Sequence, residues 1–319
     1  MPRIVHLDGF FDNPEGDFSL ENEVLSQVGE TVAAPAGEPW GEAAGAEVVL
    51  VRALRVGPAE IARLKRCRVL IRYGIGTDSI DLKAAAEAGI TVCNVPDFCL
   101  DEMADHTMAL ILALVRGVAF YRHRVEKGEW KLAPEWVMRA PSELRLVTVG
   151  FGRIARLVHE RAKVFGFERA AYDPGVAPGA IEAEGVKPLG WEEALRSADL
   201  LSLHCPLIPA TRGLLNAAAF GAMRRGAMLV NTARGPLVEL EALCDALREG
   251  RIAGAALDVT SPEPLPADHP LLVFPQVVVT PHLAWHSTAA SAKLSRKVAE
   301  EALRALKGEP LLHPVNRVG

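Results

Sequence analysis

The sequence has few of the features that mark several classes of protein. Only five of its 319 residues are cysteine, and they are widely spaced with no C-x-x-C pair, so neither a disulfide framework nor a zinc cluster is expected. The net charge is only −5 and no long block of like charges occurs, which argues against nucleic acid or an anionic membrane as a partner. A small-molecule ligand is the better expectation.

Long apolar runs are also missing. The most apolar segment, MALILALVRGVAF, is interrupted by Arg116 well short of the length of a membrane span. The first ten residues, MPRIVHLDGF, lack the basic and apolar regions of a secretion signal. These observations predict a cytoplasmic protein.

Short apolar runs alternate with helical patterns along nearly the whole chain, which is typical of parallel sheets joined by crossover helices. The predicted fold class is therefore α/β. The first hundred residues predict a small doubly wound unit, with strands at 4–7, 48–52, 68–72 and 91–94 and helices near 58–65 and 82–88. A long helix over 100–127 and a loop over 128–141 are expected next.

The rest of the chain predicts a second, larger unit with six strands. Two β-α-β-α-β halves of this kind form the arrangement that binds dinucleotides. The strands are expected at 144–149, 169–172, 200–204, 228–231, 254–257 and 277–280, and the helices between them at 153–165, 191–196, 217–223 and 240–248. One more amphipathic helix, 287–306, is expected after the last strand.

The segment VTVGFGRIARLV predicts a strand, a G-x-G-x-x-A turn and a helix. Gly150 permits a tight turn, Gly152 lets the backbone approach a pyrophosphate, and Ala155 is small enough for close helix packing. The pattern alone also fits an ordinary strand-to-helix turn, and Asp173 also fits a turn before Pro174. Because the strand, the helix and the acidic residue occur together, we predict dinucleotide binding, with Asp173 on the ribose hydroxyls and NAD favoured over NADP.

Polar residues follow the last three predicted strands, at the carboxyl edge where an open α/β sheet binds its ligand. Arg234 occurs in NTARG, Asp258 and Glu263 in LDVTSPEP, and His282 in PHLAWHS. Taken singly, each of them also fits an ordinary surface or loop position. Together, a cation, two carboxylates and an imidazole suit hydride transfer between a nicotinamide and a carbonyl next to a carboxylate.

Each of these four residues has an expected role. His282 is the natural acid/base, because an imidazole titrates near neutral pH. Glu263 is expected to bind the ring nitrogen that faces away from the substrate and to favour the charged ring. Arg234 offers a planar fork for a carboxylate, and Asp258 offers an acceptor for the carboxamide of the cofactor.

The segment TPHLAWHS raises a second possibility, because His282 and His286 have the spacing of a metal pair on one helix face. The strand ends at Thr280 and the next helix begins near Ser287, so His282 is expected in a loop and no metal site is predicted. Trp285 is either an apolar wall of the substrate pocket, which favours a substrate with a nonpolar side chain, or ordinary packing. His286 is expected to be a bystander.

Seven motifs occur in a fixed order from about Arg72 to the C-terminus. They are RYGIGTDSIDLKAAAEAGITVCNVP, ADHTMALILAL, VGFGRIA, LHCPL, NTARGPLVE, GAALDVTSPEP and TPHLAW. In this order they resemble the D-isomer-specific 2-hydroxyacid dehydrogenase family. The stretches HLAWHS and VCNVPDFCLDEMADHT most resemble the branch of that family that includes the C-terminal binding proteins.

The resemblance implies two doubly wound Rossmann-like domains. Residues 1–99 and 286–319 would form a discontinuous, flavodoxin-like substrate domain, and residues 100–285 an inserted NAD-binding Rossmann domain. It also implies NAD as the cofactor, a small 2-oxo or 2-hydroxy acid as the substrate, and a homodimer built largely through the NAD-binding domains.

Individual residues also match the family pattern. Arg234, Glu263 and His282 match the substrate-binding arginine, the supporting glutamate and the catalytic histidine. The backbone amides of Gly74, Ile75 and Gly76 match the loop that holds the substrate carboxylate, as an anion-binding nest would, although a simple strand-to-helix turn also fits. The cofactor contacts of the family match Thr107, Gly150, Gly152, Arg153, Ile154, Asp173, His204, Cys205, Pro206, Thr211, Thr232, Ala233, Arg234, Asp258 and His282.

The sequence departs from the family pattern at three places. Ala155 replaces the usual third glycine, and SELRLVTVG lacks a frequent Gly-Lys pair. Leu-Ala-Trp follows His282 where phosphoglycerate dehydrogenases usually have small residues, which counts against phosphoglycerate as the substrate. The expected function is the NAD-dependent interconversion of a 2-oxo acid and a D-2-hydroxy acid, and the alternative is a NAD(H)-sensing dimeric scaffold or corepressor that resembles C-terminal binding protein.

Overall fold

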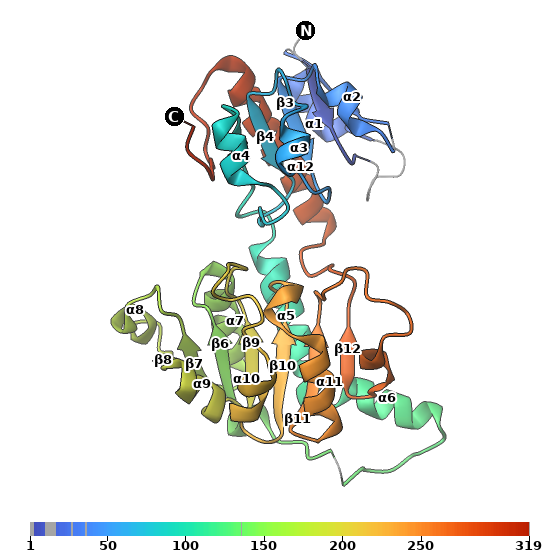
Figure 1. Ribbon diagram of the computed structural model, residues 1–319. Helices are drawn as coiled ribbons and strands as arrows, with labels where there is room; N and C mark the ends of the chain where they lie inside the picture. The colour runs from blue at the N-terminus through green and yellow to red at the C-terminus, as the bar shows by residue number, and fades with distance from the viewer. Residues whose placement is uncertain (1–2, 10–16, 27, 36, 135, 319) are drawn as a thin grey trace. The chain divides into compact units, whose positions relative to one another are not determined.

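The computed structural model describes residues 3–9, 17–26, 28–35, 37–134 and 136–318. The chain forms two compact units, each with its own parallel sheet (Figure 1). The first unit comprises Met1–Phe98 and Ser287–Gly319, and the second comprises Cys99–His286. The predicted α/β fold class with two doubly wound Rossmann-like sheets is confirmed.

The sheet of the first unit has the strand order β2-β1-β3-β4-β5, and every neighbouring pair is parallel. This is the doubly wound order of flavodoxin-like folds. Its strands are β1 (Arg3–His6), β2 (Glu30–Ala33), β3 (Val48–Val51), β4 (Val69–Arg72) and β5 (Thr91–Cys93), and its helices are α1 (Ser19–Leu25), α2 (Pro39–Ala43), α3 (Pro58–Ile61), α4 (Leu82–Glu87) and α12 (Thr288–Lys307).

Three of these elements, β2, α1 and α2, are absent from the sequence prediction. β2 is an edge strand with only one fully buried residue, Thr31, so it carries no apolar alternation. The two helices have seven and five residues, too few for a helical period to be visible. The C-terminal tail covers the opposite edge of the sheet, which is β5. The amide of Val315 donates to the carbonyl of Val92, and the side-chain oxygen of Asn316 accepts from the amide of Val92.

The sheet of the second unit has the order β12-β11-β10-β9-β6-β7-β8 and is parallel throughout. All six predicted strands are present, and their order is that of a dinucleotide-binding sheet. The seventh strand, β8, was not predicted, because it has two residues and one of them is Pro188. The strands are β6 (Arg145–Val149), β7 (Glu168–Tyr172), β8 (Lys187–Pro188), β9 (Leu200–Leu203), β10 (Ala227–Asn231), β11 (Ile252–Leu257) and β12 (Val277–Val279).

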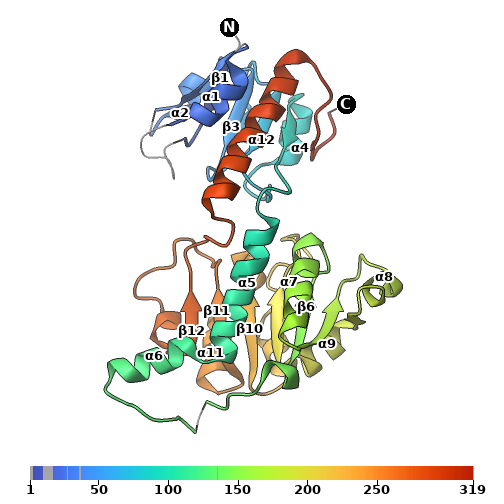
Figure 2. The same ribbon diagram turned by 180° about the vertical axis from the view of Figure 1, so that it is seen from behind.

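Helices cover both faces of this sheet, as the two opposite views show (Figures 1 and 2). On β6, Leu146 packs in the cluster of α5 and α7, whereas the next residue, Val147, packs in the cluster of α9, α10 and α11. The helices are α5 (Leu100–Val115), α6 (Val118–Glu126), α7 (Arg153–Val164), α8 (Pro178–Glu182), α9 (Trp191–Ser197), α10 (Ala217–Ala222) and α11 (Leu240–Arg248), with 3-10 turns η1 (Pro141–Glu143), η2 (Gly235–Leu237) and η3 (Pro270–Val273). Because both faces are covered, the buried residues of the strands are mostly apolar and the polar chemistry is concentrated at the strand ends.

The single helix predicted over 100–127 is wrong, because the chain bends at Gly117. Gly117 has the left-handed φ of 61°, and a Cβ there would lie 2.7 Å from the indole nitrogen of Trp136. The chain therefore forms two helices, α5 and α6, at 55° to each other. None of the described helices is by itself long and apolar enough to cross a membrane, although this bent pair together meets that test by length and composition.

Candidate active site

The glycine turn between β6 and α7 has the geometry of a phosphate cradle. Gly150 has a φ of 100°, and a Cβ there would lie 2.7 Å from the carbonyl oxygen of His204. Gly152 faces open space, with nothing within 4 Å of the position that a Cβ would take. The amides of Arg153 and Ile154 begin α7 and have no intrahelical acceptor. These donors and the positive end of the helix dipole therefore lie at the glycine turn, where an anion such as a phosphate can bind.

Asp173 follows β7 and is hydrogen-bonded to the same glycine turn. Its Oδ2 accepts from the amide of Phe151 at 2.7 Å, and its Oδ1 accepts from the amide of Gly175 at 2.8 Å. The carboxylate is half-buried, and each oxygen has a second lone pair. Asp173 therefore stands beside the glycine turn with acceptor capacity for hydroxyl groups.

Arg234 follows β10 in a loop that Asn231 shapes. The side-chain oxygen of Asn231 accepts from the amide of Ala233, and its side-chain nitrogen donates to the carbonyl of Arg234. Directly after Arg234, Gly235 touches the next loop so closely that a Cβ would lie 1.8 Å from the carbonyl oxygen of Thr260. This contact brings the Arg234 loop against the loop that carries Glu263.

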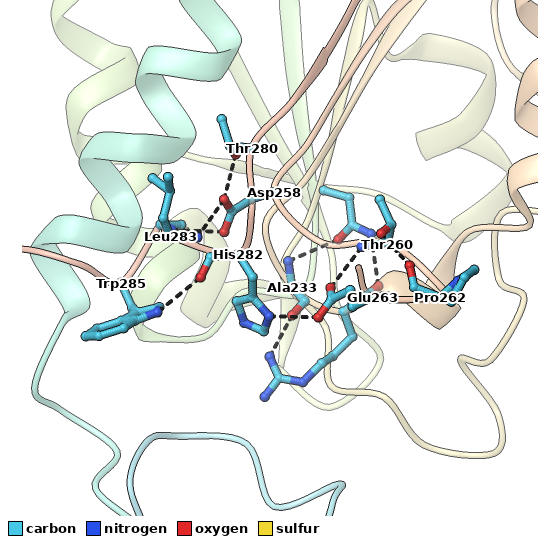
Figure 3. Close-up of polar contacts among 12 residues, drawn as sticks. Ala233, Asp258, Thr260, Pro262, Glu263, Thr280, His282, Leu283 and Trp285 are labelled. Atoms are coloured by element: carbon cyan, nitrogen blue, oxygen red, sulfur yellow. Dashed lines mark hydrogen bonds and ion pairs between the residues drawn. The ribbon is translucent and has the colours of Figure 1, made fainter. Parts of the chain in front are cut away.

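Glu263 and His282 form the centre of the site (Figure 3). Oε2 of Glu263 lies 3.0 Å from Nδ1 of His282, and Oε1 accepts from the amide of Thr260 at 2.9 Å. The side chains of His282 and Glu263 are 48% and 39% exposed. A carboxylate on Nδ1 leaves Nε2 as the nitrogen that is available to a ligand.

The surroundings keep Glu263 ionised. Burial raises the pKa of its carboxyl, but the hydrogen bond and the charge of His282 lower it, as do the Thr260 amide and the Arg234 guanidinium, and the net effect is a pKa below the ordinary value. The close contact between Gly235 and Thr260 places the Arg234 loop next to the loop that carries this carboxylate. The loops that carry Arg234, Glu263 and His282 are therefore brought together, as predicted.

Asp258 holds the backbone around His282. Its Oδ1 accepts from the amide of Leu283 and its Oδ2 from the amide of Ala284, both at 3.0 Å, and its carbonyl accepts from the amide of His282 at 2.8 Å. Asp258 is only 2% exposed. Its predicted contact with the cofactor carboxamide stays a prediction, and the structure adds a role in shaping the histidine loop.

The histidine loop itself is irregular. His282 has the positive φ of 54°, unusual for a residue other than glycine, and Trp285 donates its indole N–H to the carbonyl of His282 at 3.1 Å. His286 precedes the N-cap of α12, Ser287, so His282 and His286 do not share a helix face. Among the residues that the structure describes, no group of three or more histidine, cysteine or acidic side chains could hold a metal ion.

Other predicted cofactor contacts are engaged within the protein. Thr107 donates to the carbonyl of Met103 and lies 2.9 Å from the hydroxyl of Thr232, and Thr211 donates to the carbonyl of Pro206. Their roles in cofactor binding stay predictions, as does that of Ala233.

His204 and Cys205 begin the loop after β9. Nε2 of His204 lies 2.9 Å from the hydroxyl of Ser202, and burial lowers the pKa of His204 to about 4. Burial raises the pKa of the Cys205 thiol to about 11. Both side chains are therefore uncharged near neutral pH, and their contacts with the cofactor stay predictions.

The loop Gly74–Gly76 belongs to the first unit, where it follows β4. Gly74 has a φ of 141° and its amide donates to the carbonyl of Arg72. The amides of Ile75 and Gly76 have no acceptor within the described residues. Two of the three amides that were expected to bind a carboxylate are therefore available, and the third is not.

Residues 108–284 match the family model for the NAD binding domain of D-isomer specific 2-hydroxyacid dehydrogenases. The chain belongs to the D-isomer specific 2-hydroxyacid dehydrogenase family. The predicted family is thus confirmed, whereas the branch of the C-terminal binding proteins stays a prediction.

Relatives of this family member include D-3-phosphoglycerate dehydrogenase of Methanocaldococcus jannaschii, 35% identical over 299 residues that cover 92% of this chain and 57% of that protein. The chain thus spans little more than half the length of that relative. The TT0316 protein of Thermus thermophilus has a similar structure, with a TM-score of 0.83 and 35% identity over 98% of this chain and 99% of that one. D-lactate dehydrogenase of Aquifex aeolicus, solved with NAD and lactic acid, has a TM-score of 0.85 and 25% identity over 96% of each chain.

Two residues of this candidate site were missed by the sequence reasoning. Nε2 of His106, on α5, lies 3.2 Å from the hydroxyl of Thr280, and this hydroxyl donates to Oδ1 of Asp258 at 2.6 Å. His106 precedes Thr107 in the motif ADHTMALILAL, and Thr280 ends the last predicted strand. The position of Thr280 at a strand end is the one signal that could have singled it out.

Proposed function

We propose that the protein is an NAD-dependent oxidoreductase that interconverts a small 2-oxo acid and the corresponding D-2-hydroxy acid. The observation that carries this proposal is the pair of His282 and Glu263 at 3.0 Å, next to Arg234, on the NAD-binding domain of this family. Bound NADH supplies the hydride for the carbonyl carbon.

The three side chains divide the remaining chemistry of the reduction. Nε2 of His282 donates a proton to the carbonyl oxygen as that oxygen gains negative charge, and in the oxidation it takes the proton back. Glu263 accepts from Nδ1, fixes the tautomer and stabilises the charged ring. Arg234 binds the substrate carboxylate and contributes positive charge near the reacting oxygen.

The glycine turn and Asp173 support NAD as the cofactor. The open space at Gly152 and the free amides that begin α7 suit a pyrophosphate. The carboxylate of Asp173 suits two ribose hydroxyls and repels the 2′-phosphate of NADP. We therefore expect NADH to be used in preference to NADPH.

Trp285 and the amides of Ile75 and Gly76 are proposed to contact the substrate. The amides would bind its carboxylate, and the indole would form an apolar wall, which favours a nonpolar side chain. The sequence Leu-Ala-Trp after His282 counts against phosphoglycerate, although a relative at 35% identity is a D-3-phosphoglycerate dehydrogenase. Phosphohydroxypyruvate therefore belongs among the substrates to be tested.

We also propose that the protein is a homodimer. Trp130, Leu132 and Val137, in the segment between α6 and η1, are 87%, 76% and 79% exposed. Several large exposed apolar side chains in one short surface segment are typical of protein interfaces. Light scattering should give twice the mass of the chain, and a monomer at micromolar concentration would contradict this.

The proposed activity is tested by NADH oxidation with a panel of 2-oxo acids. The panel comprises pyruvate, glyoxylate, hydroxypyruvate, phosphohydroxypyruvate and branched or aromatic 2-oxo acids, and chiral chromatography identifies the product. We expect turnover with at least one apolar member and a D-product, and the Trp285→Ala variant should lose the preference for apolar members. An L-product, or NADH binding without turnover of any member, would contradict the proposal.

No observation favours the alternative of a NAD(H)-sensing scaffold, because a D-3-phosphoglycerate dehydrogenase and a D-lactate dehydrogenase are among the similar proteins. Pull-downs with and without NADH separate the two functions. A scaffold would show partners that depend on the cofactor and would not need His282.

A further inference from the structure

A second histidine, His106, is connected by hydrogen bonds to the loop of the proposed proton donor, His282. His106 belongs to α5, and its imidazole reaches the carboxyl end of β12. Its Nε2 lies 3.2 Å from the hydroxyl oxygen of Thr280 and 3.6 Å from Oδ1 of Asp258. The side chain of His106 is only 19% exposed, and that of Asp258 is 1% exposed, so water does not replace this contact.

The hydrogen-bond donors in this group can be assigned from the number of protons available. The hydroxyl of Thr280 has one proton, and it donates that proton to the Asp258 carboxylate at 2.6 Å. The oxygen of Thr280 can therefore only accept from His106, so Nε2 of His106 carries a proton. The group is a directed chain from His106 through Thr280 to Asp258.

The chain ends on the carboxylate that shapes the loop of His282. Asp258 accepts from the amides of Leu283 and Ala284, and its carbonyl accepts from the amide of His282. His282 is held at a φ of 54°, a conformation that a residue with a side chain rarely adopts. The loop therefore depends on these hydrogen bonds to keep the imidazole in place.

We propose that His106 is a positioning residue for His282, acting through Thr280 and Asp258. His106 directs the Thr280 proton onto the buried carboxylate and adds positive polarity beside it, so the carboxylate holds the two loop amides in one arrangement. His106 does not touch the substrate in this proposal. The proposal rests on the proposed function, because it assigns His282 as the proton donor.

The test uses variants that remove or restore the donor at residue 106. His106→Phe keeps a ring but removes the N–H, His106→Gln supplies an N–H at a similar reach, and Thr280→Val removes the connecting hydroxyl. We expect kcat for 2-oxo acid reduction to fall about five- to tenfold in His106→Phe and in Thr280→Val, with the KM for NADH unchanged. His106→Gln should recover most of the kcat that His106→Phe loses. The double variant His106→Phe/Thr280→Val should be no slower than Thr280→Val alone, because both substitutions interrupt the same chain of hydrogen bonds.

A second readout does not depend on activity. Hydrogen exchange of the peptide that contains Leu283 and Ala284 should be faster in His106→Phe and restored in His106→Gln. His123→Phe, the same substitution on α6, is the matched control and should leave both kcat and exchange unchanged.

The outcomes separate the positioning role from the proposed function. Wild-type kcat and exchange in His106→Phe, or fully additive losses in the double variant, would overturn the positioning role. Absence of turnover by the wild-type protein with every 2-oxo acid would overturn the proposed function, while the exchange result would still decide whether His106 holds the loop.

Discussion

Replacing Glu263 by glutamine removes the negative charge that faces Nδ1 of His282 and keeps the size of the side chain. Because the pKa of Glu263 lies below the ordinary value, this charge is present above the usual carboxyl pKa and is lost only as the pH falls through the lowered value. The wild-type protein therefore carries this carboxylate charge over the whole neutral and alkaline range. The variant has none of it at any pH.

The magnitude follows from the geometry of the pair. Both side chains are partly exposed, at 48% and 39%, so water screens their attraction. With a dielectric constant of about 80, two unit charges 3.0 Å apart attract by about 1.4 kcal/mol, which corresponds to about one pH unit. Since reduction needs the charged ring, the alkaline limb of the kcat profile should move by about one pH unit to lower pH in Glu263→Gln.

The assay is NADH consumption with the best 2-oxo acid, measured from mildly acidic to alkaline pH. We also expect kcat at its maximum to fall at least about tenfold, because glutamine no longer fixes the tautomer of the ring. Glu241→Gln, at an exposed glutamate of α11, is the control and should match the wild-type profile. An alkaline limb that stays in place in Glu263→Gln would refute the assignment of Glu263 as the partner of the charged ring.

Three further predictions test other parts of the account. Gly235→Ala should lower kcat/KM at least about a hundredfold, because the new Cβ would lie 1.8 Å from the Thr260 carbonyl oxygen and displace the site loops. NADH should still bind in a fluorescence titration. Gly221→Ala is the control, because a Cβ at Gly221 meets nothing within 4 Å. Asp173→Asn should reduce the preference for NADH over NADPH about tenfold in initial rates, because it removes a charge but keeps an acceptor, and an unchanged ratio would contradict its role. Burial lowers the pKa of His159 to about 3, below the ordinary 6.5, so protonation below pH 6.5 favours the unfolded chain. The free energy of unfolding in urea should therefore be about 2 kcal/mol lower at pH 5 than above pH 6.5. His159→Gln should abolish this loss.

Much of the second unit could be predicted from the sequence because its signals are local. Most of the strands contain a run of apolar residues, and the glycine turn needs particular residues at fixed spacing, so both can be recognised without any knowledge of packing. The rule that ligands bind beyond the carboxyl ends of strands then selected Arg234, Glu263 and His282. In the structure Glu263 contacts His282, and the Arg234 loop packs against the loop of Glu263.

The features that were missed depend on contacts between distant segments. His106 and Thr280 are 174 residues apart, and no local pattern indicates that their side chains meet. The break between α5 and α6 depends on Trp136 packing against Gly117, which a helical apolar pattern cannot show. The three donors to the Asp258 carboxylate, from Thr280, Leu283 and Ala284, meet it only in the folded loop, so the sequence alone does not indicate them.

The assignment of His282 as the proton donor is tested most directly by one variant, His282→Gln. NADH oxidation with the best 2-oxo acid and NADH affinity should be measured on the same preparation. Because general acid catalysis contributes about two to four orders of magnitude, we predict that kcat falls by at least about a hundredfold while the Kd for NADH stays at the wild-type value. A His282→Gln protein that reduces the 2-oxo acid at the wild-type rate would contradict the account.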